Sequence, residues 1–510
     1  MLNIIEFTFV EELLEDLAPN FGELFTIAPV DIILYGLTFL LTVLLGLKHS
    51  STSKSTMLQI SIKISYIFVT LSIVFVFYNM IDLVFVKETE EEFLELEDVW
   101  SLLIQMLFFK LIILVLNLFL LTYLPNVLHS KYYTNTLEFI ILIQISIALA
   151  MTIVTAINLV VILLALEGFS LILYILTTID RTYGGITAAA KYFSYGTLGS
   201  VLLFWGVVHI YTIVPVTEWL HLEEIFSLIN SEINSQVEIS LDFATGLIIL
   251  GLLIKFGAAP FHQWVADVYS GSHLTVTLFF STIVKFIIFI IISRIALITS
   301  SSDLIDLTAA LSLIVGTIMT LRQLEIKRFL AYSSITHVGF ILMGDFSSAI
   351  VYILLYICSS FLFFSVLLTI NSGNKELVYF SDISKVKNSG YWSPLLLTIS
   401  LLSMAGLPPF AGFFGKFMVW NSLLEDLYIY NDFTTCVLLI TSIVLSLITI
   451  FYYARLLIYI FVNNDETSEE DIHIKKLNTI SVSSQQTILT IINVFWVFFH
   501  TTVLTFIIQI

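Results

Sequence analysis

The sequence has 510 residues, of which 58% are hydrophobic and only 12% are charged. A soluble domain of this length does not need so much apolar surface, and apolar runs of membrane-spanning length recur along nearly the whole chain. The formal net charge of −18 lies mostly in connecting segments, which argues against nucleic acid as a partner. The composition predicts an all-α, polytopic membrane protein.

Hydropathy predicts about fourteen transmembrane helices. They cover residues 24–46, 61–86, 101–124, 136–155, 157–178, 189–212, 242–266, 274–298, 303–321, 327–345, 348–370, 391–423, 434–462 and 485–508. We divide the chain into an N-terminal part, two five-helix parts and a C-terminal part with an acidic loop and the last helix. Their bounds are 1–135, 136–298, 303–462 and 463–510.

The charges of the loops alternate along the chain and predict an orientation. Connections from odd to even helices carry Lys or Arg, as in Lys48–Lys54, Lys131, Arg181, Arg322–Arg328 and Lys375–Lys387. Connections from even to odd helices are acidic, as in Glu88–Asp98, Glu218–Glu232, Asp303–Asp306 and Glu425–Asp432. The basic set should face the cytoplasm or the mitochondrial matrix, with both termini outside. The 463–484 loop is the exception, because it is inner by count and yet acidic.

Two of the predicted helices contain a break that a regular helix cannot pass through unaltered. The first break is Gly257-Ala258-Ala259-Pro260, and the second is Gly406-Leu407-Pro408-Pro409. The broken helices, seven and twelve, are five spans apart. A five-helix unit that occurs twice must have inverted topology, which is a common plan in transporters with ion sites at broken helices.

Four ionisable residues lie deep within apolar helices: Glu167, Lys255, Lys285 and Lys416. A charge at mid-depth costs about 2.5–3.5 kcal/mol on insertion scales, so such residues face cavities or partners and usually serve transport. Burial disfavours the charged form of a lysine and a nearby carboxylate favours it, so an acid–lysine pair can act as a proton switch. The structural alternatives are lysines that reach the interface and a protonated acid that holds two helices together.

Several weaker candidates accompany these four. Lys191 is either a relay or an interfacial anchor, and His262, two residues past Pro260, either carries protons or binds freed backbone. His337 lies among small and hydroxylic residues that could hold water. Three further residues are better explained by snorkelling or helix pairing, namely Lys110, His209 and Arg294.

Motifs for cofactors are missing from the sequence. It contains no nucleotide-binding loop, haem motif, zinc spacing or hydrolase triad, so we expect no cofactor or metal in this chain. Cys358 and Cys436 lie in apolar runs and suggest neither a disulfide nor a thiolate site. The acidic residues from Glu6 to Asp16 argue against a signal or transit peptide.

Six stretches together resemble the antiporter-like membrane subunits of respiratory complex I, in particular NADH dehydrogenase subunit 2. They are LEGFSLILYIL (166–176), AAAKYFSYGTLGS (188–200), KFGAAPFHQWVADVYSG (255–271), FFSTIVKF (279–286), IKRFLAYSSITHVGF (326–340) and SMAGLPPFAGFFGKF (403–417). The resemblance implies helices four to eight and nine to thirteen as inverted repeats. It also implies that Glu167 pairs with Lys255, that Lys285 is a central relay, and that Lys416 faces the outlet or a neighbouring subunit.

The resemblance further implies a subunit of an H⁺-translocating NADH:ubiquinone reductase with no redox chemistry of its own. NADH, FMN, iron–sulfur clusters and ubiquinone would be bound elsewhere in the complex. The expected partners are lipid and other membrane-arm subunits, including a subunit 4-type neighbour. The expected location is the mitochondrial inner membrane, with the bacterial plasma membrane as the alternative.

The sequence departs from the family at the entry to the eighth helix. Ala266 stands where a proline is usual, and Ser272-His273 replaces a small residue followed by proline, so this bend could be altered. Lys416, where the subunit 4 type usually has glutamate, favours subunit 2. Two other functions remain open: a free-standing multisubunit cation/proton antiporter, and a scaffold that only braces the membrane arm.

Overall fold

The computed structural model describes residues 54–89, 97–128, 136–219, 235–298, 302–371, 378–384, 392–430 and 432–462, with isolated positions around them. In this part of the chain every regular element is a helix, and ten helices are long and apolar enough to cross a membrane. The protein is therefore a multi-pass membrane protein. The expected helix 24–46, nearly all of 485–508, and the 463–484 loop lie outside the described residues.

The helices agree closely with the expected spans. In chain order they are α3 (Lys54–Thr89), α4 (Glu97–Leu128), α5 (Thr136–Thr155), α6 (Leu159–Thr177), α7 (Tyr183–Ile213), α9 (Ser235–Phe256), α10 (Gln263–Gly271), α11 (Leu274–Phe279), the π-helix η2 (Phe280–Val284), α12 (Lys285–Ile298), α13 (Ser302–Leu321), α14 (Ile326–Met343), α15 (Phe346–Asn371), α16 (Phe380–Ile383), α17 (Trp392–Ala405), α18 (Ala411–Tyr430) and α19 (Phe433–Phe461). Three helices begin well before the residue that hydropathy indicates, and the first of these, α3, begins at Lys54 rather than at residue 61. α9 begins at Ser235 rather than near Asp242, and α7 begins at Tyr183 because the Thr182 side chain caps it by accepting the Gly185 N–H.

The contacts divide the chain into two units. The first comprises residues 1–118 and 136–156, and here α3 packs on α5 and a buried hydrogen bond joins Asn117 to Gln144. Lys110 lies in this unit and is 1% exposed. Of the two explanations for Lys110, snorkelling is therefore wrong, because a snorkelling side chain leaves its ammonium in water.

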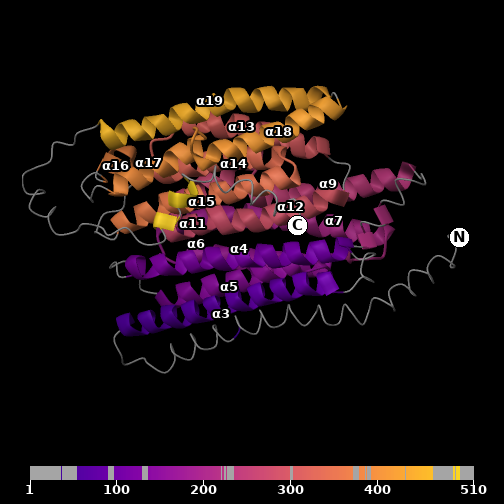
Figure 1. Ribbon diagram of the computed structural model, residues 1–510, viewed down its shortest axis with the longest axis horizontal. Coiled ribbons are helices and arrows are strands. Elements are labelled where there is room, and N and C mark those ends of the chain that lie inside the picture. Colours follow the sequence, from indigo (N-terminus) through magenta and orange to yellow (C-terminus); the bar gives the residue numbers. More distant parts are fainter. Residues whose placement is uncertain are drawn as a thin grey trace, which may run out of the picture. The chain divides into compact units, whose positions relative to one another are not determined.

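The second unit comprises residues 119–135 and 157–510, and its helices run roughly parallel to one another (Figure 1). At one end, Lys327 donates to the carbonyl of Ser272 and Arg455 donates to that of Leu321. Arg181 lies at this end too, in the connection between α6 and α7. At the opposite end acidic residues lie in the connections, at Glu218, Asp345 and Asp432, and within two helices, at Asp303 of α13 and Glu425 of α18. In the described loops of this unit the basic residues lie at the first end, together with Asp180 and Glu325, and the second end carries acidic residues. We call these the basic end and the acidic end.

The two breaks have the same backbone geometry. Gly257 and Gly406 have φ of +78° and +76°, which only glycine adopts readily. In each break the glycine N–H bonds three residues back, to the carbonyl of Ile254 or Ser403, and the next N–H bonds five residues back, to that of Leu253 or Leu402. This is the pattern of a Schellman motif, in which a left-handed glycine ends a helix. A cis X–Pro peptide bond follows in both.

A second feature also occurs twice. The segment before α6 pairs with the segment after α7 in an isolated antiparallel bridge, Asn158 to Glu218. The segment before α14 pairs with the segment before α16 in the same way, Glu325 to Tyr379. The first bridge lies at the acidic end of the second unit and the second bridge lies at the basic end.

Glycines allow α7 and α9 to pack closely. A Cβ on Gly251 would lie 2.6 Å from the carbonyl oxygen of Gly199, and a Cβ on Gly206 would lie 2.7 Å from that of Ala244. Small residues at helix crossings let the backbones approach in a membrane, where apolar side chains gain nothing by leaving lipid. The close approach fixes α9 and the break that follows it.

We expect Gly251→Ala to destabilise the protein by about 1–3 kcal/mol, because the methyl group overpacks this crossing. Gly246 on the same helix has nothing within 4 Å of its Cβ position, so Gly246→Ala is the matched control and should leave stability unchanged or slightly raised. The check is the temperature at which half of the detergent-solubilised assembly is lost. Equal values for the two variants would contradict the packing argument.

Candidate functional site

Lys255 and Glu167 form an ion pair between α9 and α6. The Lys255 Nζ lies 2.8 Å from Oε1 of Glu167, and the two side chains are 7% and 35% exposed. Glu167 lies halfway along α6, between the exposed residues Leu164 and Leu171. The pair therefore joins a side chain inside the second unit to one at its surface.

Neighbouring side chains satisfy the backbone groups freed at the first break. The indole N–H of Trp264 donates to the carbonyl of Ile254 at 3.0 Å, one residue before Lys255. The N–H of Ala259 donates to the hydroxyl of Ser312 at 2.9 Å. Buried backbone groups need partners of this kind when a helix is interrupted within a membrane protein.

Lys285 directly follows the π-helix η2 and is 4% exposed. Its Nζ donates to the carbonyl of Ser334 on α14 at 2.8 Å and lies 5.5 Å from the centre of the Tyr356 ring. A π-helical turn within an α-helix often marks a functional site, and here it sets the direction in which the lysine points.

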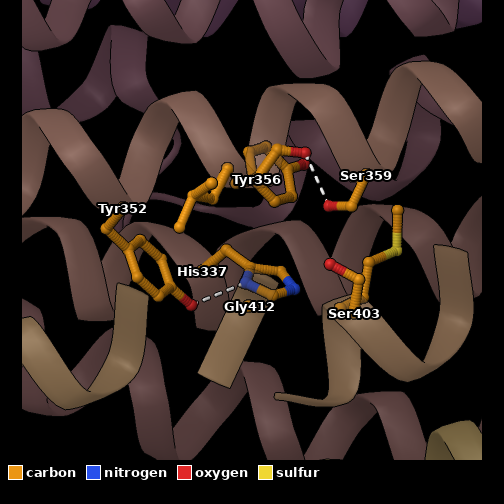
Figure 2. Close-up of a pocket in the computed structure, with 8 residues that line it drawn as sticks. His337, Tyr352, Tyr356, Ser359, Ser403 and Gly412 are labelled. Carbon is orange, nitrogen blue, oxygen red and sulfur yellow. Dashed lines mark hydrogen bonds between the residues drawn. The ribbon is translucent and has the colours of Figure 1, made fainter. Parts of the chain in front are cut away.

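His337 lies in a group of tyrosines next to Lys285. Nδ1 bonds to the hydroxyl of Tyr352 at 2.8 Å and Nε2 to that of Tyr453 at 3.1 Å. The ring also lies 4.7 Å from the Tyr356 ring, so Lys285 and His337 share one aromatic neighbour. Figure 2 shows Ser403 across from His337 in a small cavity that Tyr352 and Tyr356 also line. Its volume of about 10 Å³ has room for about one water molecule.

Lys416 on α18 returns to the second break. It is 2% exposed, and its Nζ donates to the carbonyl of Ala405 at 2.8 Å and to the hydroxyl of Thr449 at 3.0 Å. The ring of Phe340 lies 5.1 Å from the ammonium. A Cβ on Gly406 would come within 2.8 Å of the lysine side chain, so the glycine serves both the turn and the lysine.

The weaker candidates lie elsewhere. Lys191, two turns inside α7, makes an ion pair with Asp267, and both side chains are partly exposed. His262 precedes α10; its Nδ1 is buried without a hydrogen-bond partner, and its ring faces Tyr332. His209 packs edge to face on Phe243, in keeping with helix pairing.

The entry to the eighth helix keeps its bend despite the missing prolines. α10 ends at Gly271, and His273 caps α11 by accepting the Thr275 N–H at 3.3 Å. Burial and the Lys327 ammonium lower the pKa of His273 to about 3, so the imidazole is neutral and can accept. The hydrogen bond from Lys327 to Ser272 fixes the other side of the bend.

Sequence reasoning found the buried charges and missed their neutral partners. The tyrosines around His337 lie in the apolar helices α15 and α19, and nothing in either helix distinguishes them from core aromatics. The acceptors of Lys285 and Lys416 are backbone carbonyls, which no side-chain pattern reveals. A signal was available for Lys191, because Asp267 is the acidic residue within the otherwise uncharged run QWVADVYSG.

The region that carries these residues also matches a known family. Residues 156–449 match the model described as NADH:quinone oxidoreductase/Mrp antiporter, TM, which covers more than half of the chain. The chain belongs to this family. The matched region includes Glu167, Lys255, Lys285 and Lys416, whereas the buried Lys110 lies before it.

Individual relatives support the same assignment. An NADH-quinone oxidoreductase subunit N from Ruthia magnifica is 34% identical over 58% of this chain and 65% of its own length. One from Hydrogenovibrio crunogenus is 31% identical over 70% of this chain and 75% of its own length. The part of the chain that aligns is thus about two thirds to three quarters of these family members.

Solved structures share the fold of the family. Respiratory complex I from Thermus thermophilus contains a chain with a TM-score of 0.67 and 21% identity, covering 92% of this chain and 98% of that one. The Mrp complex from Dietzia contains one with a TM-score of 0.65 and 18% identity, covering 79% and 82%. The membrane-bound sulfane sulfur reductase, an archaeal respiratory complex, gives 0.75 at 17% identity, covering 95% and 96%.

We expect Tyr352→Phe to lower stability by about 1–3 kcal/mol, because it leaves the buried Nδ1 of His337 without its partner. Tyr428, which is 92% exposed, supplies the control Tyr428→Phe. Thermal denaturation of the solubilised assembly would measure both. If the two substitutions had the same effect, the hydrogen bond would not be part of the folded structure.

Proposed function

We propose that this chain is a proton-translocating membrane subunit of an NADH-quinone oxidoreductase. Its relatives are called subunit N, and its six sequence stretches resemble NADH dehydrogenase subunit 2. The observation that carries the proposal is the set of three lysines, each under 9% exposed, within the family region. Buried cations of this kind mark ion or proton paths in membrane proteins.

The contacts support a path in two parts. Protonated Lys255 is held by the Glu167 carboxylate, and a neutral Lys255 would lose that attraction and could move. Lys285, His337 and Lys416 continue the path, with hydroxyls from tyrosines and Thr449 beside them. Hydroxyls both donate and accept, so they can pass protons between the charged groups, with His337 as a relay. His262, beside the first break, would be a further relay, whereas the ion pair of Lys191 with Asp267 suits a positioning role better than a relay.

For the architecture we propose fourteen transmembrane helices with two inverted repeats, helices four to eight and nine to thirteen. The equivalent breaks at Gly257 and Gly406 support it. The two isolated bridges support the inversion, because they lie at opposite ends of the second unit.

We propose that the redox reactions of the complex take place in other subunits. NADH, FMN, iron–sulfur clusters and ubiquinone would be held by other subunits, and lipid and other membrane-arm subunits, with a subunit 4-type neighbour, would surround the chain. The named relatives are bacterial, which favours the plasma membrane over the mitochondrial inner membrane.

The alternative is a subunit of a free-standing cation/proton antiporter. The family description and the likeness to the Mrp complex favour it as the second candidate. Copurification from native membranes distinguishes the two functions: the first predicts subunits of an NADH-oxidising complex, and the second predicts antiporter subunits with no NADH oxidation.

We expect Lys255→Met and Glu167→Gln each to lower proton pumping per NADH oxidised by about tenfold or more, because a positioned proton-transfer group contributes at least that much to its step. Lys63, an exposed lysine of α3, supplies the control Lys63→Met. Proton uptake by sealed vesicles and NADH oxidation would be measured together.

Removal of one partner from a buried pair can itself cost about 3–5 kcal/mol, so the amount of assembled complex must be measured for every variant. Full pumping by assembled Lys255→Met would overturn the role of the pair. Loss of pumping in Lys63→Met to the same degree would show that the assay responds to any lost lysine.

We propose that the basic end of the second unit faces the cytoplasm or matrix. In a chain without Cys358 and Cys436, Gln323→Cys should react with an impermeant thiol reagent only from that side, and Asp432→Cys only from the other. The reverse pattern would overturn the whole orientation, whereas a 463–484 loop on the outer side would overturn only the last two spans.

A further inference from the structure

The short helix α10 contacts α7 at regular intervals. Gln263 accepts a hydrogen bond from the Tyr195 hydroxyl at 2.8 Å, and Asp267, four residues later, pairs with Lys191. Four residues further, the Cβ of Gly271 would lie only 2.5 Å from the carbonyl oxygen of Gly184. Residues four apart share one face of a helix, so one face of α10 lies along α7 in antiparallel register.

The length of α10 makes these contacts important. It has nine residues, fewer than an isolated helix needs to be stable. The equivalent helix after the second break, α18, has 20 residues. α18 carries the buried Lys416 near its break, whereas α10 carries Asp267, which pairs with Lys191 on α7. α10, which is too short to be stable alone, is thus the helix that an ion pair joins to a neighbouring helix.

The position of α10 is transmitted to Lys255 through the break. Trp264 on α10 holds the carbonyl of Ile254, and the side chain of Val265 lies against Gly257, where an added Cβ would be 2.6 Å away. A displacement of α10 would therefore pull on the last turn of α9, which carries Lys255.

We propose that Lys191 and Asp267 are positioning residues, and that their ion pair holds α10 on α7 so that Lys255 stays in contact with Glu167. The expected effect on pumping rests on the proposed function, whereas the contact between α7 and α10 is independent of that function. Lys191 lies within the apolar span Tyr183–Ile213, and the Lys191 and Asp267 side chains are 55% and 35% exposed.

Hydrogen exchange of residues 263–271 in the assembled complex tests directly whether the Lys191–Asp267 pair holds α10 on α7. Lys191→Met and Asp267→Asn should each raise exchange of these amides about fivefold or more, as expected when a locally stabilising contact is lost. The charge-reversed double variant Lys191→Asp/Asp267→Lys should restore slow exchange. Tyr183→Phe, at a residue of α7 that is 85% exposed, is the control and should change nothing.

The same variants should lower proton pumping per NADH and displace its pH dependence, with recovery in the double variant. Unchanged exchange in both single variants, or no recovery on charge reversal, would overturn the positioning role. If exchange rises as expected while Lys255→Met itself pumps normally, the Lys191–Asp267 pair does hold α10 on α7, and the proposed function is wrong.

Discussion

The second unit depends on the cost of placing lysines in a dry interior. Each ammonium has three donors and no acceptor, so each must find acceptors where water is scarce. Lys255 uses a carboxylate, and Lys285 and Lys416 use backbone carbonyls, with a hydroxyl added for Lys416. The helix breaks and the π-helical turn are the local distortions beside which these lysines lie.

The two halves of the unit solve the same backbone problem with different side chains. Both breaks end a helix with a left-handed glycine and continue through a cis proline. The lysine precedes the first break and binds across to α6, whereas the lysine of the second break follows it and binds back to the end of its own broken helix. The same backbone geometry thus occurs with the lysine on either side of the break.

The sequence carried enough information for the class, the spans and the buried charges, because apolar length and isolated charges are local properties. The early start of α7 was missed because Gly184, Gly185 and Thr187 lower the hydropathy although Thr182 caps the helix. The partners of the charges could not be read in the same way. The Tyr352 hydroxyl and the Ser334 carbonyl meet His337 and Lys285 only after three or more helices have packed. Loop charge predicted two ends of opposite sign; in the described loops of the second unit the basic residues lie at one end, but Asp180 and Glu325 lie there too.

The carbonyl acceptors have a consequence for evolution and for genetics. Every residue has a main-chain oxygen, so no substitution at Ser334 or Ala405 deletes the group that Lys285 or Lys416 contacts. The acceptor in each interaction thus depends on where the backbone runs and not on which side chain is present. Either side chain could change within the space that its buried position allows while the lysine kept its acceptor, and a scan of side chains would report the lysines as solitary.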